Sequence, residues 1–111
     1  MTSPEIFVAP VDNIPNIWSF RPSIDVFNIS EAVFDAACPI DSRVLGEVGA
    51  VLMQELFKIP GVVHIEIKSH SVFLIQKAPD ADWVELQPRI VDKLKVVFGE
   101  QSEKVVVKEE V

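Results

Sequence analysis

The strongest constraint on the fold is an apolar helical stripe that stops at Pro60-Gly61 and is followed at once by an alternating strand. Between residues 41 and 58, apolar residues recur at spacings of three and four, which is one face of a helix. These residues are Leu45, Val48, Leu52 and Leu56, and Ile59 continues the pattern just after the range. Either Asp41 or Ser42 can cap the start, and Pro60-Gly61 ends it. We predict one helix from Asp41 or Ser42 to Lys58.

Two strands follow this helix. Val62–Lys68 alternates, with Val63, Ile65 and Ile67 on one face and polar residues on the other, which is typical of a half-buried strand. Val72–Lys77 returns as its partner across a turn at residues 69–71. Its continuous apolar run predicts a central strand covered on both faces.

A second helix is predicted after residues 78–80. Asp82 and Glu85 have the spacing of a capping box, and an apolar stripe runs along the segment. Its members are Trp83, Leu86, Ile90, Leu94 and Val97 or Phe98. Pro88 lies inside this stripe, where proline removes a backbone hydrogen bond. We therefore expect an irregular first turn, a regular helix from Pro88 to Phe98, and an end at Gly99.

The remaining segments give weaker patterns. Glu5–Ala9 and Asn16–Phe20 read as strands, joined by a loop at Val11–Pro15. Val26-Phe27 favours a third strand over Ile24–Ile29, and Ser30–Ile40 stays unassigned. Residues 104–108 are either a last edge strand or a frayed acidic tail.

These elements follow the order β-β-β-α-β-β-α, with room for a short C-terminal strand. The order predicts an α+β fold of two layers, in which two helices cover one face of a mostly antiparallel sheet. The 111 residues are one domain's worth, so we expect a single domain (1–111) with an ordered core at about residues 5–98.

Composition excludes several functional classes. Apolar residues make up 49% of the chain, yet no run approaches the ~20 residues of a membrane span. A net charge of −7 without a basic stripe makes nucleic acid a poor partner. The first residues carry neither a secretory signal nor a mitochondrial presequence, so we expect the cytoplasm.

No catalytic or metal-binding group is evident. Cys38 is the one cysteine, so no disulfide or cluster can be closed within one chain. We expect it to be packed, with a reactive or dimer-shared thiol as the alternative. His64 and His70 lack a third ligand, and Asp80 and Asp82 read as loop and cap residues. We therefore expect no enzyme activity, cofactor, bound metal or small-molecule substrate.

Several segments together resemble the N-terminal domain of Nfu/NifU-type iron–sulfur scaffold proteins, over roughly residues 5–98. The matching pieces are Pro-Asn-Ile-Trp-Ser-Phe (15–20), Leu-Phe-Lys-Ile-Pro-Gly-Val (56–62), Phe-Leu-Ile-Gln-Lys (73–77), Asp-Trp (82–83) and Leu-Gln-Pro-Arg-Ile (86–90). Two departures are the entry Asp-Asn-Ile-Pro-Asn (12–16), where the family has Thr-Pro-Asn-Pro-Asn, and a longer segment at 30–49.

The resemblance implies a non-catalytic accessory domain in iron–sulfur cluster assembly or delivery. Nothing here matches the family's Cys-x-x-Cys cluster-binding domain, so the implied partners are separate iron–sulfur assembly or acceptor proteins. The implied partner surface is the open sheet face or the first loop, with Asp12, Asn13, Pro15 and Asn16. We expect Trp18, Phe57 and Trp83 to be core anchors, with Trp83 between the second helix and the sheet.

Two other functions stay open. Helix–strand–strand–helix orders with a Gly-Val-x-x-Ile strand also occur in ferredoxin-like domains, which favours a small-ligand-binding or regulatory domain unrelated to clusters. The metallochaperone version of that fold would need a Cys-x-x-Cys before its first helix, and none is present. A small enzyme is the third reading, but the chain offers no nucleophile–base pair.

Overall fold

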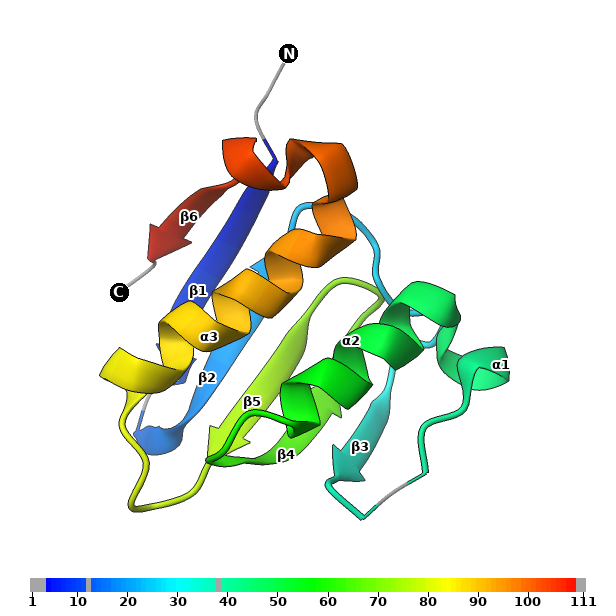
Figure 1. Cartoon of the computed structure of the whole chain (residues 1–111). Coiled ribbons are helices and arrows are strands. Elements are labelled where there is room, and N and C mark those ends of the chain that lie inside the picture. The colour runs from blue at the N-terminus through cyan, green and yellow to red at the C-terminus, as the bar shows by residue number, and fades with distance from the viewer. Residues whose placement is uncertain (1–3, 12, 38, 110–111) are drawn as a thin grey trace.

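The chain forms a six-stranded sheet with its main helices layered on one face (Figure 1). The structure is a computed structural model that describes residues 4–11, 13–37 and 39–109. The strands are β1 (Glu5–Val11), β2 (Ile14–Pro22), β3 (Ala32–Asp35), β4 (Val62–Ile67), β5 (Phe73–Lys77) and β6 (Val106–Glu109). The helices are α1 (Ser42–Leu45), α2 (Glu47–Phe57), α3 (Trp83–Lys95) and the 3-10 segment η1 (Val96–Lys104).

The sheet order is β3-β4-β5-β2-β1-β6. All neighbouring strands are antiparallel except β6, which runs parallel to β1. The predicted α+β fold, with a mostly antiparallel sheet and two helices on one face, is therefore confirmed. The C-terminal strand is present as β6.

The core lies between the sheet and the helices α2 and α3. Apolar side chains from alternate strand positions meet the apolar stripes of the helices, as the two periodicities require. The sheet contributes Ile6, Val8, Phe20, Val62, Ile65, Ile67, Phe73 and Ile75, and the helices contribute Leu45, Ala50, Leu52, Met53, Leu56, Leu86, Ile90, Val91 and Leu94. All of these side chains are buried.

The third strand was predicted in the wrong place. Residues 24–29 form a loop, and β3 lies further along at Ala32–Asp35. The backbone N–H groups of Val26 and Phe27 both donate to the His70 carbonyl instead of to a strand, at 2.8 and 2.9 Å. Val26 and Phe27 are apolar because this loop closes one end of the core, where both are buried.

The first long helix is two helices. Gly46 has φ +85° and ψ 161°, outside the helical region, so α1 ends there and α2 begins at Glu47. The stripe that begins at Leu45 therefore does not continue in register through α2. Val48, predicted to face the core, is 52% exposed, and Gly49, Ala50 and Met53 face inward instead.

In β4 and β5, two details differ from prediction. The β4–β5 register shifts between Val62 and His64, and the extra residue places Val62 on the core face in place of Val63. β5 is central, but only one face is covered: Phe73 and Ile75 are buried, whereas Leu74 is half-buried on the other face. None of the described residues forms a second layer there.

The helix α3 is regular from Trp83 onward, although an irregular first turn was predicted. Pro88 cannot donate to the carbonyl of Val84, and both residues are exposed. Water can hydrate that carbonyl on the solvent side, so the helix continues through the proline. Regular helix ends at Lys95, earlier than the predicted Phe98. None of the helices in the described residues is long and apolar enough to cross a membrane.

Candidate functional site

Three of the family-like segments meet where β2 begins, β5 ends and α3 begins. The residues that make these contacts are Pro15, Asn16, Trp18, Lys77 and Trp83, which we call the Trp83 cluster. The indole Nε1 of Trp83 donates to the Pro15 carbonyl at 2.8 Å, across 68 residues of sequence. The Trp83 ring also lies against Trp18, with the two ring centroids 5.6 Å apart. A hydrogen bond and an aromatic contact thus hold α3 to the sheet at this end.

Lys77 is the buried cation of this cluster. Its side chain is 8% exposed, and its Nζ donates to Asn16 Oδ1 at 3.0 Å and to the Ala78 carbonyl at 3.2 Å. Both acceptors are neutral. Because an unpaired buried ammonium is costly, the Asn16 amide is a structural partner of Lys77.

Of the residues predicted to bind a partner, some are exposed and one makes a structural contact. The connection between β1 and β2 is shorter than the expected loop, since Val11 already pairs with Ile14. Asn13 has φ +63°, a conformation that asparagine tolerates, and both Asn13 and Pro15 are exposed. Asn16 is half-buried against Lys77. Asp12 lies outside the described residues.

The three predicted core anchors pack against the core at its margin. Trp18, Phe57 and Trp83 are all half-buried. Trp83 does lie between α3 and the sheet, where its ring centroid is 6.4 Å from that of the buried Phe20.

Two other polar candidates, His70 and Asp82, form hydrogen bonds with the backbone. His70 Nδ1 lies 2.9 Å from the Phe27 carbonyl, so this nitrogen carries the proton that it donates. Asp82 accepts from the Val84 N–H at 2.9 Å, which confirms its role as the helix cap. Among the described residues, no three His, Cys, Asp or Glu side chains are placed to hold a metal ion. The prediction for Cys38 lies outside those residues.

A groove of about 580 Å³ lies between α2 on one side and α3 with η1 on the other. The side chains that line it are mainly apolar, and three of the valines are open to solvent. Val48 is 52% exposed, Val51 53% and Val96 68%. The groove residues are Glu47, Val48, Val51, Leu52, Glu55, Lys93, Val96, Val97 and Gly99. We call this cavity, with its continuation toward Pro60, the α2/α3 groove.

The continuation begins at an ion pair. Glu55 accepts from Lys93 at 3.1 Å and from Lys58 at 3.2 Å, and these hydrogen bonds hold the pKa of the Glu55 carboxyl below its ordinary value. Beyond it, a second hollow of about 410 Å³ is lined by Glu55, Lys58, Ile59, Pro60, Arg89, Asp92, Lys93 and Val96. Three basic and two acidic side chains lie here, whereas the chain as a whole carries −7.

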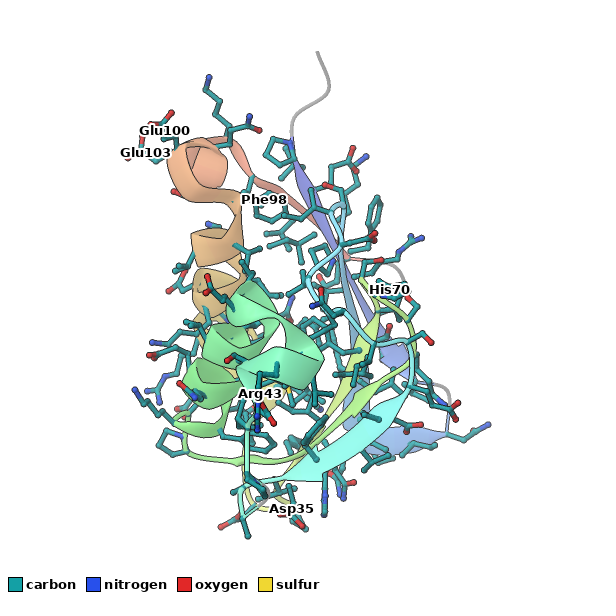
Figure 2. All side chains as sticks on the ribbon, turned by 90° about the vertical axis from the view of Figure 1, so that its right-hand side faces the viewer. Asp35, Arg43, His70, Phe98, Glu100 and Glu103 are labelled. Carbon is teal, nitrogen blue, oxygen red and sulfur yellow. The ribbon has the colours of Figure 1, made fainter. Side chains whose placement is uncertain are left out.

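The opposite end of the groove is acidic. Glu47 belongs to the groove itself, and η1 carries Glu100 and Glu103 just beyond it. Figure 2 shows both glutamates pointing away from the sheet at the outer end of η1, whereas Phe98 points toward the strands. The groove is therefore apolar in its larger half and acidic at the η1 end. The Arg89 end carries charges of both signs, because Arg89 also lines the next hollow together with Asp80, Asp82 and Glu85.

Sequence reasoning missed this groove. Its signal is the short row of Val48 and Val51, which lie three residues apart on α2 with about half of each side chain exposed. Valine is a poor helix former on a solvent-exposed face, so such a row is informative once its exposure is known. The predicted uninterrupted helix placed Val48 in the core and thereby hid the row.

The uncovered face of the sheet is a more mixed surface. The Phe7 ring lies between the Arg21 guanidinium, 4.5 Å from its centroid, and the Lys108 ammonium, 5.7 Å from it. Further along this face, a shallow depression of about 180 Å³ is lined by Ile17, Val33, His64, Glu66, Leu74 and Gln76. Its small volume gives a partner little to fill.

Comparison with known proteins identifies the fold. No protein-family model and no curated protein matches the sequence. The crystal structure of protein SAV1430 from Staphylococcus aureus superposes with a TM-score of 0.60 at 14% identity, over 78% of this chain and 93% of that one. A Staphylococcus epidermidis protein solved by NMR gives a TM-score of 0.50 at 23% identity, over 81% and 93%. At these identities, the likeness shows a shared fold alone.

Proposed function

We propose that this chain is a non-catalytic interaction domain in iron–sulfur cluster assembly or delivery, acting with a separate cluster-carrying protein. The observation that carries the proposal is the way the family-like segments come together. Asn16 contacts Lys77 at 3.0 Å and Trp83 contacts Pro15 at 2.8 Å, and each contact joins two segments of the Nfu/NifU-like pattern. These contacts join the family-like segments into one continuous part of the fold.

The cysteine content supports a partner that holds the cluster. The 111 residues contain one cysteine, whereas [2Fe–2S] and [4Fe–4S] clusters are held by four ligands. The ligands of such a cluster must therefore come largely or wholly from outside these 111 residues. A delivery complex must also release its partner, which favours a small interface of micromolar affinity, about −8 kcal/mol.

A titration followed by NMR tests the proposal. A Cys-x-x-Cys Nfu-type domain and a cluster-accepting enzyme from the same cell are each added to the ¹⁵N-labelled chain. We expect backbone amide shifts on one contiguous surface, with a Kd on the order of micromolar. The absence of shifts with every assembly protein at high concentration would refute the proposal.

The size of the α2/α3 groove favours one alternative, a small-ligand-binding or regulatory domain. A volume of about 580 Å³ falls within the range of small-molecule sites. Such sites cover most of the ligand surface, however, whereas Val48, Val51 and Val96 leave this groove open along its length. Saturable shifts with a metabolite, in the absence of shifts with any assembly protein, would favour the alternative.

A further inference from the structure

We infer that the α2/α3 groove is the docking site for an amphipathic helix of a partner protein. The apolar side chains of that helix would contact Val48, Val51 and Val96, and one of its carboxylates would lie near Arg89. The inference draws on the proposed function only in taking the partner to be a protein. It adds the surface, the conformation of the docking segment and its charge.

The dimensions of the groove fit a helix. From Val48 to its C-cap Lys58, α2 lines the groove over eleven residues. The ten steps of 1.5 Å between them give a length of ~15 Å, nearly three helical turns. Val48 and Val51 lie on one wall and Val96 on the other. Side chains at i, i+4 and i+7 of a docked helix can enter between these walls, as in other helix-in-groove complexes.

The charges of the groove set the orientation and the kind of partner. Within the described part of the chain, Arg89 forms no ion pair, while Lys58 and Lys93 share the single carboxylate of Glu55. The Arg89 guanidinium, which lies near Glu85 and Asp92 without an ion pair to either, can therefore accept a carboxylate. At the η1 end, Glu47 and Glu100 favour a basic residue instead. A helix that is acidic at one end and basic at the other complements both.

The same argument disfavours a second copy of this chain as the occupant. Two copies related by a two-fold axis along their α2 helices would bring Val48 and Val51 of each copy together, which suits the apolar part. A parallel arrangement would bring the two Glu47 side chains together. An antiparallel one would place Glu47 of each copy near the basic residues of the other, but in both arrangements the two chains each carry −7, and this net repulsion opposes association. Self-association is therefore an outcome that counts against the inference.

The test uses a designed peptide as a stand-in for the partner helix. The peptide is capped at both termini and carries leucines at i, i+4 and i+7, glutamates at the N-terminal end and lysines at the C-terminal end. Added to the ¹⁵N-labelled full chain, it is expected to shift the amides of α2, the C-terminal half of α3 and η1. Shifts confined to the open sheet face, or none, would overturn the inference.

Variants make the test specific. Val51→Asp should weaken peptide binding by about tenfold, as loss of a central contact does. The matched control is Val33→Asp, which changes a valine that is 65% exposed on the open sheet face and should leave the Kd unchanged. Dispersed amide spectra establish that both variants fold, and Val96→Ser gives a second groove variant. Equal effects of Val51→Asp and Val33→Asp would contradict the docking site.

A charge exchange tests the carboxylate. Arg89→Glu should weaken binding of the peptide by about fivefold, and a peptide with lysines in place of its glutamates should restore the affinity for this variant. Sedimentation at the NMR concentration identifies the other occupant, because a dimer that Val51→Asp dissociates would assign the groove to a second copy. If the peptide binds but no assembly protein does, the docking site is supported and the proposed iron–sulfur role is refuted. If an assembly protein binds but Val51→Asp leaves its affinity unchanged, the iron–sulfur role is supported and the docking site is refuted.

Discussion

The two ends of α3 are built differently. At its N-terminal end, Asp82 caps the helix and Trp83 joins it to β2 through a hydrogen bond and an aromatic contact. At its C-terminal end, the helix passes into η1 and leaves Val96 68% exposed beside the open groove. One helix thus carries contacts that hold the fold at one end and accessible apolar surface at the other.

This difference teaches that exposed apolar residues and fold-stabilising residues can be separated along a single element. The Trp83 cluster uses its polar atoms internally, so little is left for a partner. The groove uses few of its apolar atoms internally, so they remain available. The predictions below, from the largest effect to the smallest, compare what the two ends contribute to stability.

The largest effect is expected for Trp83→Ala. The substitution removes the contacts with Trp18 and Phe20 and the hydrogen bond to Pro15, and it should lower the free energy of unfolding by about 3 kcal/mol. This is the low end of the range for large aromatic residues, because Trp83 is half-buried. Urea denaturation measures it. Trp83→Phe, which keeps a ring and loses the donor, should cost about 1 kcal/mol.

Asn16→Ala should follow. Among the described residues, it leaves the buried Lys77 ammonium with the Ala78 carbonyl as its one remaining acceptor, at a cost of about 2 kcal/mol. The control is the same substitution in a Lys77→Met background, where no ammonium remains to be satisfied and the cost should fall by at least half. An equal loss in both backgrounds would show that Asn16 acts independently of Lys77.

Asp82→Ala removes the cap of α3. The Val84 N–H loses its acceptor, and unfolding should become easier by about 1 kcal/mol. Asp82→Asn keeps a side-chain oxygen at the same position and should recover most of the stability. Thermal unfolding of the two variants side by side checks this, and a loss of equal size in both would point to charge rather than capping.

The smallest effect concerns Glu55. Lys93 and Lys58 lower its pKa in the folded state, so its ion pairs stabilise the fold above the unfolded-state pKa and stop doing so as the pH falls through the lower, folded-state pKa. The pairs are solvent-exposed, so the change in stability should be slight. An NMR titration of the Glu55 carboxyl should give a lower midpoint than in Lys93→Met, and identical midpoints would contradict the assignment.

The layered fold could be read from the sequence because its main elements have clear periods. The stripe at Leu52 and Leu56 and the alternation of Ile65 and Ile67 each match one element of the structure. Asp82 was recognised as a cap because capping depends on neighbours in sequence. Such local features do not require knowledge of the tertiary structure.

The errors arose where tertiary contacts decide. Val26 and Phe27 form an apolar pair like a strand, but they bond to His70 and close the core as a loop. Gly46 lies inside the single helix predicted from Asp41 or Ser42 to Lys58, whereas its positive φ breaks that helix and moves Val48 outward. The groove depends on that shift together with the position of η1, so no local pattern could have located it.

The most direct test of the account measures stability and binding on the same two variants, one from each region. For Val51→Asp, we predict a free energy of unfolding within about 0.5 kcal/mol of the unmodified chain and peptide binding weakened about tenfold. For Asp82→Ala, we predict a loss of about 1 kcal/mol in stability and an unchanged Kd. If either variant changes stability and binding together, the separation of the two regions is contradicted.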